Sequence, residues 1–263
     1  MDLGLQGKVA MVAGASKGLG FAIAQSLATE GASISIASRN AEAIEAAAER
    51  IRNQHTENVL GCAADVSSGA AIQRWHEATV ARFGAVDLLV TNSGGPPAGT
   101  FSSLDDGAWQ AAFELLVLSA VRLLRQVLPS MVARKTGSIV LLTSSSVKEP
   151  IANLTLSNVL RASVSALGKT LANEYAMAGI RVNQMVPGRF ATDRVRELDE
   201  IASKKKGITV EQQQNAAMAN IPMGRYGNAD EFARAVTFVL SDAASFITGA
   251  TLQVDGGQIR SVL

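Results

Sequence analysis

The chain has 263 residues, of which 48% are hydrophobic and 18% are charged, a composition typical of a folded globular protein and unlike that of a disordered chain. Its 24 lysines and arginines almost balance its 23 aspartates and glutamates, so the formal net charge is only +1. This balance gives no support to the binding of nucleic acid or of an anionic membrane surface. One short basic cluster stands out, formed by Lys204, Lys205 and Lys206, and we expect it in a solvated loop.

The cysteine content and the hydropathy pattern indicate a compartment. Cys62 is the one cysteine, so no internal disulfide can form and no sign of an oxidising compartment is present. We find no uninterrupted apolar run of about 18 residues, the length that a membrane-spanning helix needs. The opening segment MDLGLQGKVAMVAG has neither the basic region nor the long apolar stretch of a signal peptide. We therefore expect a cytoplasmic protein with no membrane association.

Short apolar segments alternate with longer amphipathic ones along the whole chain. The short segments have four to six residues, are bounded by Gly, Asp, Asn or Ser, and predict strands at residues 9–13, 33–37, 59–63, 88–91, 138–143, 181–186 and 251–254. The longer segments carry apolar residues at helical spacing and predict helices at residues 19–29, 42–53, 71–82, 109–134, 155–177 and 230–242.

This alternation indicates βαβ units, in which right-handed crossovers build a parallel sheet covered by helices on both faces. The predicted fold is α/β, a doubly wound Rossmann-type domain with a seven-stranded parallel sheet. We see no linker or internal repeat, so we expect one domain over residues 1–263. The least regular segment, residues 192–223, is polar and contains QQQ, and we expect it to form a mobile flap over a substrate cleft.

A glycine-rich turn follows the first predicted strand and precedes the first predicted helix. Its sequence is GASKGLG, and such turns let backbone N–H groups approach a diphosphate at the positive end of the following helix. The position between strand and helix is the context that a dinucleotide-binding motif requires. The candidate cofactor-binding residues in this turn are Gly14, Ser16, Lys17, Gly18, Leu19 and Gly20.

The spacing Gly-x3-Gly-x-Gly resembles the motif of the short-chain dehydrogenase/reductase (SDR) family, and further segments similar to that family follow in the family's order. They are AADVSS, VTNSGG, IRVNQMVPG and ITGATLQVDGG, and together they cover almost the whole chain. The resemblance implies that Asp65 in AADVSS lies near the adenine, that Thr192 after IRVNQMVPG lies at the nicotinamide side, and that ITGATLQVDGG forms the closing strand. The cofactor-binding residues that it adds are Asp65, Val66, Asn92, Ser93, Gly94, Pro187, Gly188 and Thr192.

The segment after the second predicted strand indicates which dinucleotide is bound. In dinucleotide folds an acidic residue at this place takes the ribose hydroxyls, whereas a basic residue accepts a 2′-phosphate. This chain has Ser38, Arg39 and Asn40 there, without an acidic residue. Arg39 offers a planar fork for phosphate and Lys17 offers a second positive charge. We therefore expect NADP(H) and not NAD, although both cations could also be ordinary solvated side chains.

The catalytic pattern of the family is altered in this chain. SDR enzymes generally use a tetrad of asparagine, serine, tyrosine and lysine. The strand segment GSIVLLTSS aligns Ser144 with the serine, and the tyrosine position thirteen residues later holds Ser157. The lysine position holds Arg161, and the asparagine position holds Leu116. The resemblance thus implies an atypical active site in which three of the four residues differ.

These substitutions change the available acid–base chemistry. A tyrosine with a pKa of about 10 can be tuned by a nearby cation, whereas a serine hydroxyl is a far weaker acid. Arginine stays charged and cannot relay a proton as lysine can. Ser157 and Arg161 would face the same cleft and could bind the ribose, a carboxylate or a phosphate. Lys148, four residues after Ser144, is our candidate for a substitute acid, but it could equally be a plain surface lysine.

Two hypotheses about function stay open. The first is an NADP(H)-dependent oxidoreductase that acts on a small carbonyl or alcohol substrate, with Ser144 orienting the oxygen. The GGPPAGTF turn and the Ser-x3-Arg pattern resemble a divergent SDR subgroup akin to the 3-oxoacyl-(acyl-carrier-protein) reductases. The second is an NADP(H)-binding protein with little or no catalysis, acting as a sensor or assembly partner. A third possibility is a non-redox enzyme on this fold, such as a lyase or an epimerase, but no feature of the sequence indicates one.

The remaining expectations concern metals and assembly. No residue cluster has metal-ligand spacing, and we expect neither His55 nor His76 to be catalytic. The family resemblance implies a homo-oligomer, a tetramer or dimer, formed through the long helices at residues 109–134 and 155–177 and the C-terminal strand.

Overall fold

The seven strands form one parallel sheet in the computed structural model, which describes residues 2–261. The strand order is β3-β2-β1-β4-β5-β6-β7, the doubly wound arrangement that the sequence predicts. The strands are β1 (Val9–Ala13), β2 (Ser33–Ser38), β3 (Val59–Ala63), β4 (Leu88–Thr91), β5 (Gly137–Leu142), β6 (Ile180–Pro187) and β7 (Thr251–Val254).

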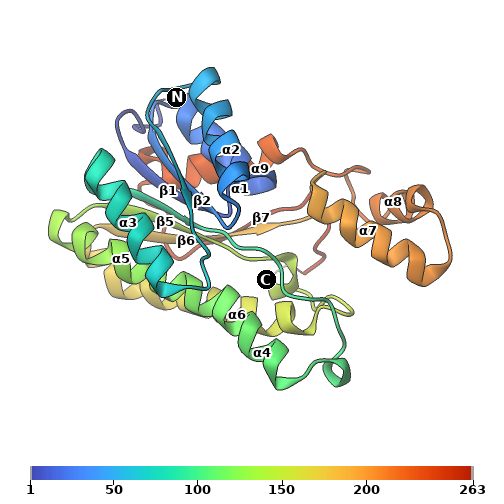
Figure 1. Ribbon diagram of the computed structural model, residues 1–263. Coiled ribbons are helices and arrows are strands. Elements are labelled where there is room, and N and C mark those ends of the chain that lie inside the picture. The colour runs from blue at the N-terminus through green and yellow to red at the C-terminus, as the bar shows by residue number, and fades with distance from the viewer. Residues whose placement is uncertain (1, 262–263) are drawn as a thin grey trace.

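Helices cover both faces of this sheet (Figure 1). One layer contains α1, α2 and α9, and the other contains α3, α5 and α6, as the two large hydrophobic clusters show. The helices are α1 (Gly18–Thr29), α2 (Ala41–Gln54), α3 (Gly69–Phe83), α4 (Asp106–Phe113), α5 (Ser119–Arg134), α6 (Thr155–Tyr175), α7 (Asp193–Lys206), α8 (Val210–Met218) and α9 (Ala229–Leu240).

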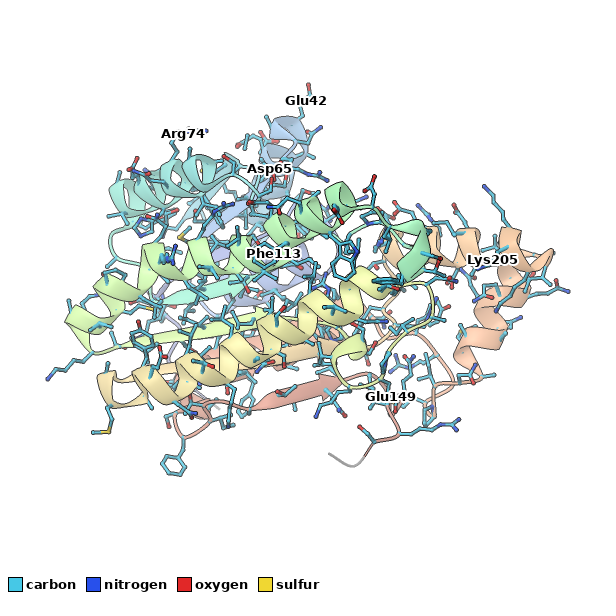
Figure 2. All side chains as sticks on the ribbon, turned by 90° about the horizontal axis from the view of Figure 1, so that it is seen from below. Glu42, Asp65, Arg74, Phe113, Glu149 and Lys205 are labelled. Atoms are coloured by element: carbon cyan, nitrogen blue, oxygen red, sulfur yellow. The ribbon has the colours of Figure 1, made fainter. Side chains whose placement is uncertain are left out.

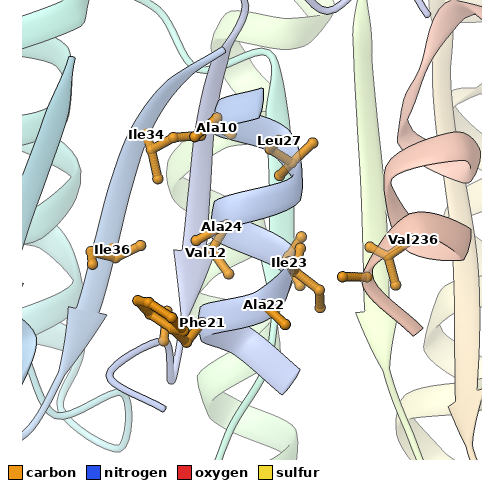
Figure 3. Packing of buried hydrophobic residues seen from close by; sticks show 14 of the residues in the cluster. Ala10, Val12, Phe21, Ala22, Ile23, Ala24, Leu27, Ile34, Ile36 and Val236 are labelled. Carbon is orange, nitrogen blue, oxygen red and sulfur yellow. The ribbon is translucent and has the colours of Figure 1, made fainter. Parts of the chain in front are cut away.

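The central strand β1 is buried on both faces, which explains its uninterrupted apolar sequence. Ala10 and Val12 point into the cluster beneath α1, whereas Met11 and Ala13 point into the opposite cluster. Figure 3 shows the first cluster, in which Val12 lies near the side chains of α1. Because successive residues of a strand alternate between faces, the register of β1 fixes both layers and the position of the turn that follows it.

The predicted long helix at residues 109–134 is interrupted. It consists of α4, a π-helical turn at Glu114–Leu118 and α5. The helical stretch Asp106–Arg134 is long and apolar enough to cross a membrane by length and composition, with an 18-residue window of mean hydropathy 1.5. Half of that window is buried inside the protein, and a buried core helix passes the same test. It packs between the sheet, α3 and α6, so its apolar content is used in the core.

The prediction of an irregular segment at residues 192–223 is wrong, because the segment contains the two helices α7 and α8. The hydroxyl of Thr192 accepts a hydrogen bond from the backbone N–H of Val195 and caps α7. Thr209 and Gln212 form a reciprocal capping box at the start of α8. The three lysines are exposed as expected, but they lie in the last turn of α7 and not in a loop. There they face the negative end of the helix dipole.

A buried polar network fixes α7 to the end of β6. Asp199 of α7 is fully buried, where one carboxylate oxygen pairs with Arg189 and the other accepts a hydrogen bond of 2.8 Å from the Tyr226 hydroxyl. The Arg189 guanidinium also lies 5.4 Å from the centre of the Tyr226 ring. Burial, and then the hydrogen bond to Asp199, raises the pKa of Tyr226. These contacts hold the middle of α7 while its first turn reaches the predicted site.

Candidate active site

The residues predicted to form the site gather at the carboxyl-terminal edge of the sheet, where ligands bind in open α/β folds. Contacts between distant segments bring them together. Asn92, after β4, donates a hydrogen bond of 3.0 Å to the carbonyl of Gly14 after β1. Arg161 of α6 reaches the carbonyl of Gly94, and Thr192 lies over Gly18. Segments that follow four different strands therefore share one site.

Two glycines of the turn, Gly14 and Gly20, are packed too closely to carry side chains. Gly14 and Gly18 have positive φ angles of 60° and 63°, which favour glycine. A Cβ atom on Gly20 would lie 2.4 Å from the Gly14 carbonyl oxygen and 2.9 Å from Nδ2 of Asn92. This close packing holds the start of α1 against the end of β1, where the first N–H groups of the helix have no partner within the helix.

The start of α1 is suited to a bound anion. Its N-cap residue, Lys17, has extended backbone geometry and makes no side-chain capping hydrogen bond, and its first turn has no acidic residue. By contrast, the side chains of Asn40, Ser68 and Asp105 cap α2, α3 and α4. The uncapped N–H groups and the helix dipole make this end of α1 the place where a diphosphate fits. The residues present therefore fit the dinucleotide predicted from the sequence.

The two cations expected to bind a ribose phosphate, Arg39 and Lys17, differ in their ion-pair partners. Arg39 is exposed and forms no ion pair within residues 2–261. Lys17 instead forms an ion pair of 3.1 Å with Asp193, the first residue of α7. The hydrogen bond and the charge of Lys17 lower the pKa of Asp193. Ser38, beside Arg39, donates a hydrogen bond of 3.3 Å to the carbonyl of Asn40. Arg39 is thus free for a phosphate, whereas Lys17 must leave a carboxylate to bind one.

The adenine-side residues lie after β3. One oxygen of the Asp65 carboxylate accepts hydrogen bonds from the backbone N–H of Ser67 at 2.9 Å and from its hydroxyl at 2.8 Å. Val66 is buried next to it. The second Asp65 oxygen makes no hydrogen bond within the described part of the chain, residues 2–261. It can accept one from the amino group of a base.

Two of the predicted catalytic hydroxyls are held by local contacts. Ser144 is half-buried at the end of β5, and its hydroxyl accepts a hydrogen bond of 3.2 Å from the backbone N–H of Ser146. This bond starts a short 3-10 turn that carries the chain toward Lys148. Ser157 is buried, with 6% of its surface exposed, and its hydroxyl accepts a hydrogen bond of 3.2 Å from Nε of Arg161. The i,i+4 spacing predicted for this pair therefore produces a direct contact.

Arg161 is bound to backbone carbonyls at the ends of two strands. Its Nη1 lies 3.4 Å from the carbonyl oxygens of Leu142 and Thr143, and its Nη2 lies 3.5 Å from that of Gly94. Burial, followed by the like charge of Arg194, lowers the pKa of Arg161 to about 10. The guanidinium therefore stays charged at neutral pH, with long and weak hydrogen bonds and no carboxylate partner among residues 2–261.

Leu116, which the resemblance aligns with the asparagine of the tetrad, is apolar and buried. It lies in the π-helical turn and packs in a small hydrophobic cluster with Ala112, Leu156 and Leu160. Beside it is a cavity of about 10 Å³, the size of a single water molecule, which Arg161 also lines. The leucine side chain offers no hydrogen bond to such a water, so this part of the site differs chemically from a site with asparagine.

Lys148 is half-buried in the loop after β5, but its ammonium group forms no hydrogen bond or ion pair with any described residue. The structure therefore does not tie it to Ser144 or Arg161. The next residue, Glu149, accepts a hydrogen bond of 2.9 Å from the backbone N–H of Arg260, so the C-terminal segment lies against this loop (Figure 2). The role of Lys148 as an acid stays a prediction.

Sequence reasoning missed one site residue, Arg194. A Cβ atom on Gly95 would lie 3.0 Å from Nη2 of Arg194, so this guanidinium rests directly on the glycine turn after β4. The available signal was a basic residue two positions after Thr192, the residue expected at the nicotinamide. The histidines lie elsewhere, since His55 ends α2 and His76 is within α3, where burial lowers its pKa. Among residues 2–261 no group of His, Cys, Asp and Glu could hold a metal ion.

A larger cavity, of about 460 Å³, lies at the opposite edge of the sheet. Leu88, Gly137 and Ile180, at the amino-terminal ends of three strands, line it. None of the predicted cofactor-binding or catalytic residues contributes to it. Position in the fold, and not cavity size, therefore identifies the candidate site.

Comparisons with known proteins show what the chain is similar to. A family model described as Enoyl-(Acyl carrier protein) reductase matches residues 14–258. The 3-oxoacyl-(acyl-carrier-protein) reductase of Escherichia coli K12 is 35% identical over 257 residues, which are 97% of this chain and 98% of that protein. L-sorbose reductase from Gluconobacter frateurii, solved with NADPH and L-sorbose, is 32% identical with a TM-score of 0.95 and full coverage of both chains.

One further solved structure is relevant to the altered tetrad. It is an NADPH-bound short chain oxidoreductase from Pseudomonas aeruginosa PAO1, described as containing an atypical catalytic center. It is 28% identical, has a TM-score of 0.88, and the match covers 97% of this chain and 98% of that one.

Proposed function

Because the chain belongs to the short-chain dehydrogenase/reductase family, we propose that it is an NADP(H)-dependent oxidoreductase that acts on a carbonyl/alcohol pair through an atypical active site. The observation that carries the proposal is the glycine turn at the uncapped start of α1, with the unpaired Arg39 beside it. The NADPH named in the similar solved structures supports the same cofactor.

The residues of this chain have distinct roles toward the cofactor. The N–H groups of the turn bind the diphosphate, and Arg39 binds the 2′-phosphate in a charge-assisted hydrogen bond. Asp65 accepts a hydrogen bond from the adenine, and Thr192 lies at the nicotinamide side. Pro187 and Gly188 continue β6 to this place, where Gly188 packs so closely on Asp255 that a Cβ atom would lie 2.6 Å from its Cα. When bound, the cofactor supplies the hydride.

The substrate oxygen lies beside Ser144, whose hydroxyl orients it. Arg161 supplies positive charge near the oxyanion that develops on reduction, and it also lies within reach of the nicotinamide ribose. Lys148 is the candidate proton donor, because Ser157 is buried, bonded to Arg161 and a weak acid.

A second candidate function is binding of NADP(H) with little or no catalysis, in which the protein serves as a sensor or assembly partner. A specific observation favours it. Of the four tetrad positions, Leu116 and Ser157 are buried and carry no group that titrates near neutral pH, and Arg161 is bound to carbonyls. The cofactor end would then be complete while the acid–base chemistry is missing.

One experiment separates the two functions. The protein is titrated with NADPH and then with NADH, and cofactor fluorescence reports binding. Consumption of NADPH is then followed with ketones, aldehydes and 3-oxoacyl thioesters. Binding of NADPH with turnover of any of these supports the oxidoreductase. Tight binding with no turnover in the whole panel supports the second function, and no binding of either dinucleotide overturns both.

The assembly belongs to the same proposal. We expect one domain over residues 1–263, located in the cytoplasm, with the segment 192–223 acting as a substrate flap. We expect a homo-oligomer, a tetramer or dimer, formed through α5 and α6. Val132 of α5 and Val159 of α6 are exposed at 38% and 51%, which is consistent with burial against a second copy. Analytical ultracentrifugation measures the oligomeric state directly, and a monomer at micromolar concentration would contradict this expectation.

A further inference from the structure

Two arginines meet on the turn that follows β4. Arg161 of α6 contacts this turn, with Nη2 at 3.5 Å from the carbonyl oxygen of Gly94. Arg194 of α7 also lies against this turn, with Nη2 at 3.0 Å from the place that a Cβ atom on Gly95 would take. Two guanidinium groups from elements far apart in the sequence therefore contact consecutive residues of one turn.

Among residues 2–261 Arg161 has no carboxylate partner, and Arg194 has only an exposed one. Arg161 donates only to backbone carbonyls and to the Ser157 hydroxyl among the residues the structure describes. The ion pair of Arg194 within residues 2–261 is with Glu197, at 3.6 Å on the same helix, and about half of each side chain is exposed. Exposed pairs of this kind are weak and exchange readily. Burial, and then the like charge of Arg194, lowers the pKa of Arg161, which is consistent with two like charges lying close together.

The position of the pair relates it to the substrate. Nη1 of Arg161 lies 3.4 Å from the carbonyl oxygen of Thr143, the residue before Ser144, so this guanidinium lies close to the residue proposed to orient the substrate oxygen. The phosphates of the cofactor have other partners, namely the start of α1 and Arg39. A guanidinium fork matches the paired oxygens of a carboxylate or phosphate, and an anion between two guanidiniums relieves their repulsion.

We infer that the substrate carries an anionic oxygen group, a carboxylate or a phosphate, close to its carbonyl, and that Arg194 binds this group with Arg161. This inference rests on the proposed function and narrows it to oxo acids and phosphorylated ketones. Arg194 is the specificity-determining residue of the site. Because it is the second residue of α7, it also connects the helical segment 193–218 to the bound substrate.

The test uses two pairs of probes that differ in one charge, acetoacetate with methyl acetoacetate and dihydroxyacetone phosphate with dihydroxyacetone. Binding to the protein saturated with NADP⁺ is measured by calorimetry, and NADPH oxidation is followed in parallel. In at least one pair the anion binds about tenfold or more tightly than its neutral partner. Arg194→Gln removes that preference, and Gly95→Ala lowers it because the added Cβ displaces the guanidinium. Arg196→Gln, on the same helix and 65% exposed, keeps the preference as the matched control.

The outcomes separate this inference from the proposed function. Equal binding of charged and neutral probes, or no binding of any of the four, overturns the inference while NADPH binding leaves the proposed function standing. An equal effect of Arg196→Gln overturns it too, because a general positive field would then explain the preference. If Arg194→Gln weakens NADPH binding as much as anion binding, Arg194 serves the cofactor and the inference is wrong.

Discussion

The turn after β1 and the segment after β5 lie at the same edge of the sheet, yet they build their parts of the site differently. The turn after β1 acts through its backbone N–H groups. It requires glycine at position 20, because a Cβ atom on Gly20 would lie 2.4 Å from the Gly14 carbonyl oxygen. The second uses the side chains of Ser144, Ser157 and Arg161, so each substitution changes its chemistry. A backbone-built cofactor site can therefore persist unchanged while the side-chain-built catalytic site beside it is rewritten.

The largest effect is expected from a substitution in the glycine turn after β1. Gly20→Val places a branched side chain against the Gly14 carbonyl and the Asn92 amide, which forces the turn open. We expect NADPH affinity to fall by more than about 100-fold, measured by calorimetry on protein whose circular dichroism is native. Gly69→Ala is the control, because its nearest neighbour, Arg122, would lie 3.5 Å from the new Cβ. Undiminished NADPH binding by Gly20→Val would remove the turn from the cofactor site.

The second prediction concerns the segment after β5, where two substitutions would restore the family's tyrosine and lysine. Ser157→Tyr combined with Arg161→Lys supplies a phenol and a lysine at the family's spacing, and a positioned general acid contributes on the order of 100-fold or more. We expect carbonyl reduction to rise by about that factor in a steady-state assay. Ser157→Phe with Arg161→Lys is the control, because it has the same ring without the hydroxyl. An equal rate for both double variants would show that the missing proton donor is not what limits this site.

The third prediction concerns the choice of cofactor. Arg39→Ala removes the exposed, unpaired guanidinium beside the expected 2′-phosphate. Hydrogen bonds to charged groups contribute about 1.5–3 kcal/mol, so NADPH affinity should fall by about 10- to 100-fold while NADH affinity is unchanged. Arg74→Ala removes a cation from the exposed face of α3 and should change neither affinity (Figure 2). A parallel loss of NADH affinity in Arg39→Ala would contradict phosphate recognition.

The smallest effect is expected at the ion pair between Lys17 of the glycine turn and Asp193 of α7. Asp193→Asn releases Lys17 for the cofactor phosphate, and since the pair is exposed we expect NADPH affinity to rise by no more than about fivefold. Acidification should act in the same direction only below the ordinary range of an aspartate, because Lys17 lowers the pKa of Asp193. Asp230→Asn, an exposed change in the first turn of α9, is the control. Weaker NADPH binding by Asp193→Asn would show that the carboxylate positions Lys17 and does not compete for it.

Most of the fold could be predicted because its strands are short apolar runs between turn residues. The predicted bounds of β1, β3, β4 and β7 coincide with the structure. The helices α7 and α8 were missed because the residues that they bury are polar, namely Asp199, Ser203 and Gln213. Their helical periodicity therefore lacks the apolar stripe on which such predictions depend.

The candidate site could be predicted only where its residues act through the backbone or through local spacing. The glycine turn follows from its place between a strand and a helix, and the contact of Ser157 with Arg161 follows from their i,i+4 spacing. The pair of Lys17 and Asp193 joins residues 176 positions apart, so no local pattern contains it. Arg194 was missed for the same reason.

The π-helical turn between α4 and α5 has a geometric consequence for the pocket. A π-helical turn closes its hydrogen bonds one residue farther along the chain than an α-helix, so Glu114–Leu118 holds one more residue than an α-helical turn while α4 and α5 continue as one helical stretch. Removing one residue there would return the turn to α-helical spacing and change the position of Leu116 against Leu156 and Leu160, while the other residues of the wall keep their types. A change in chain length at this one turn is thus a separate route to a different substrate.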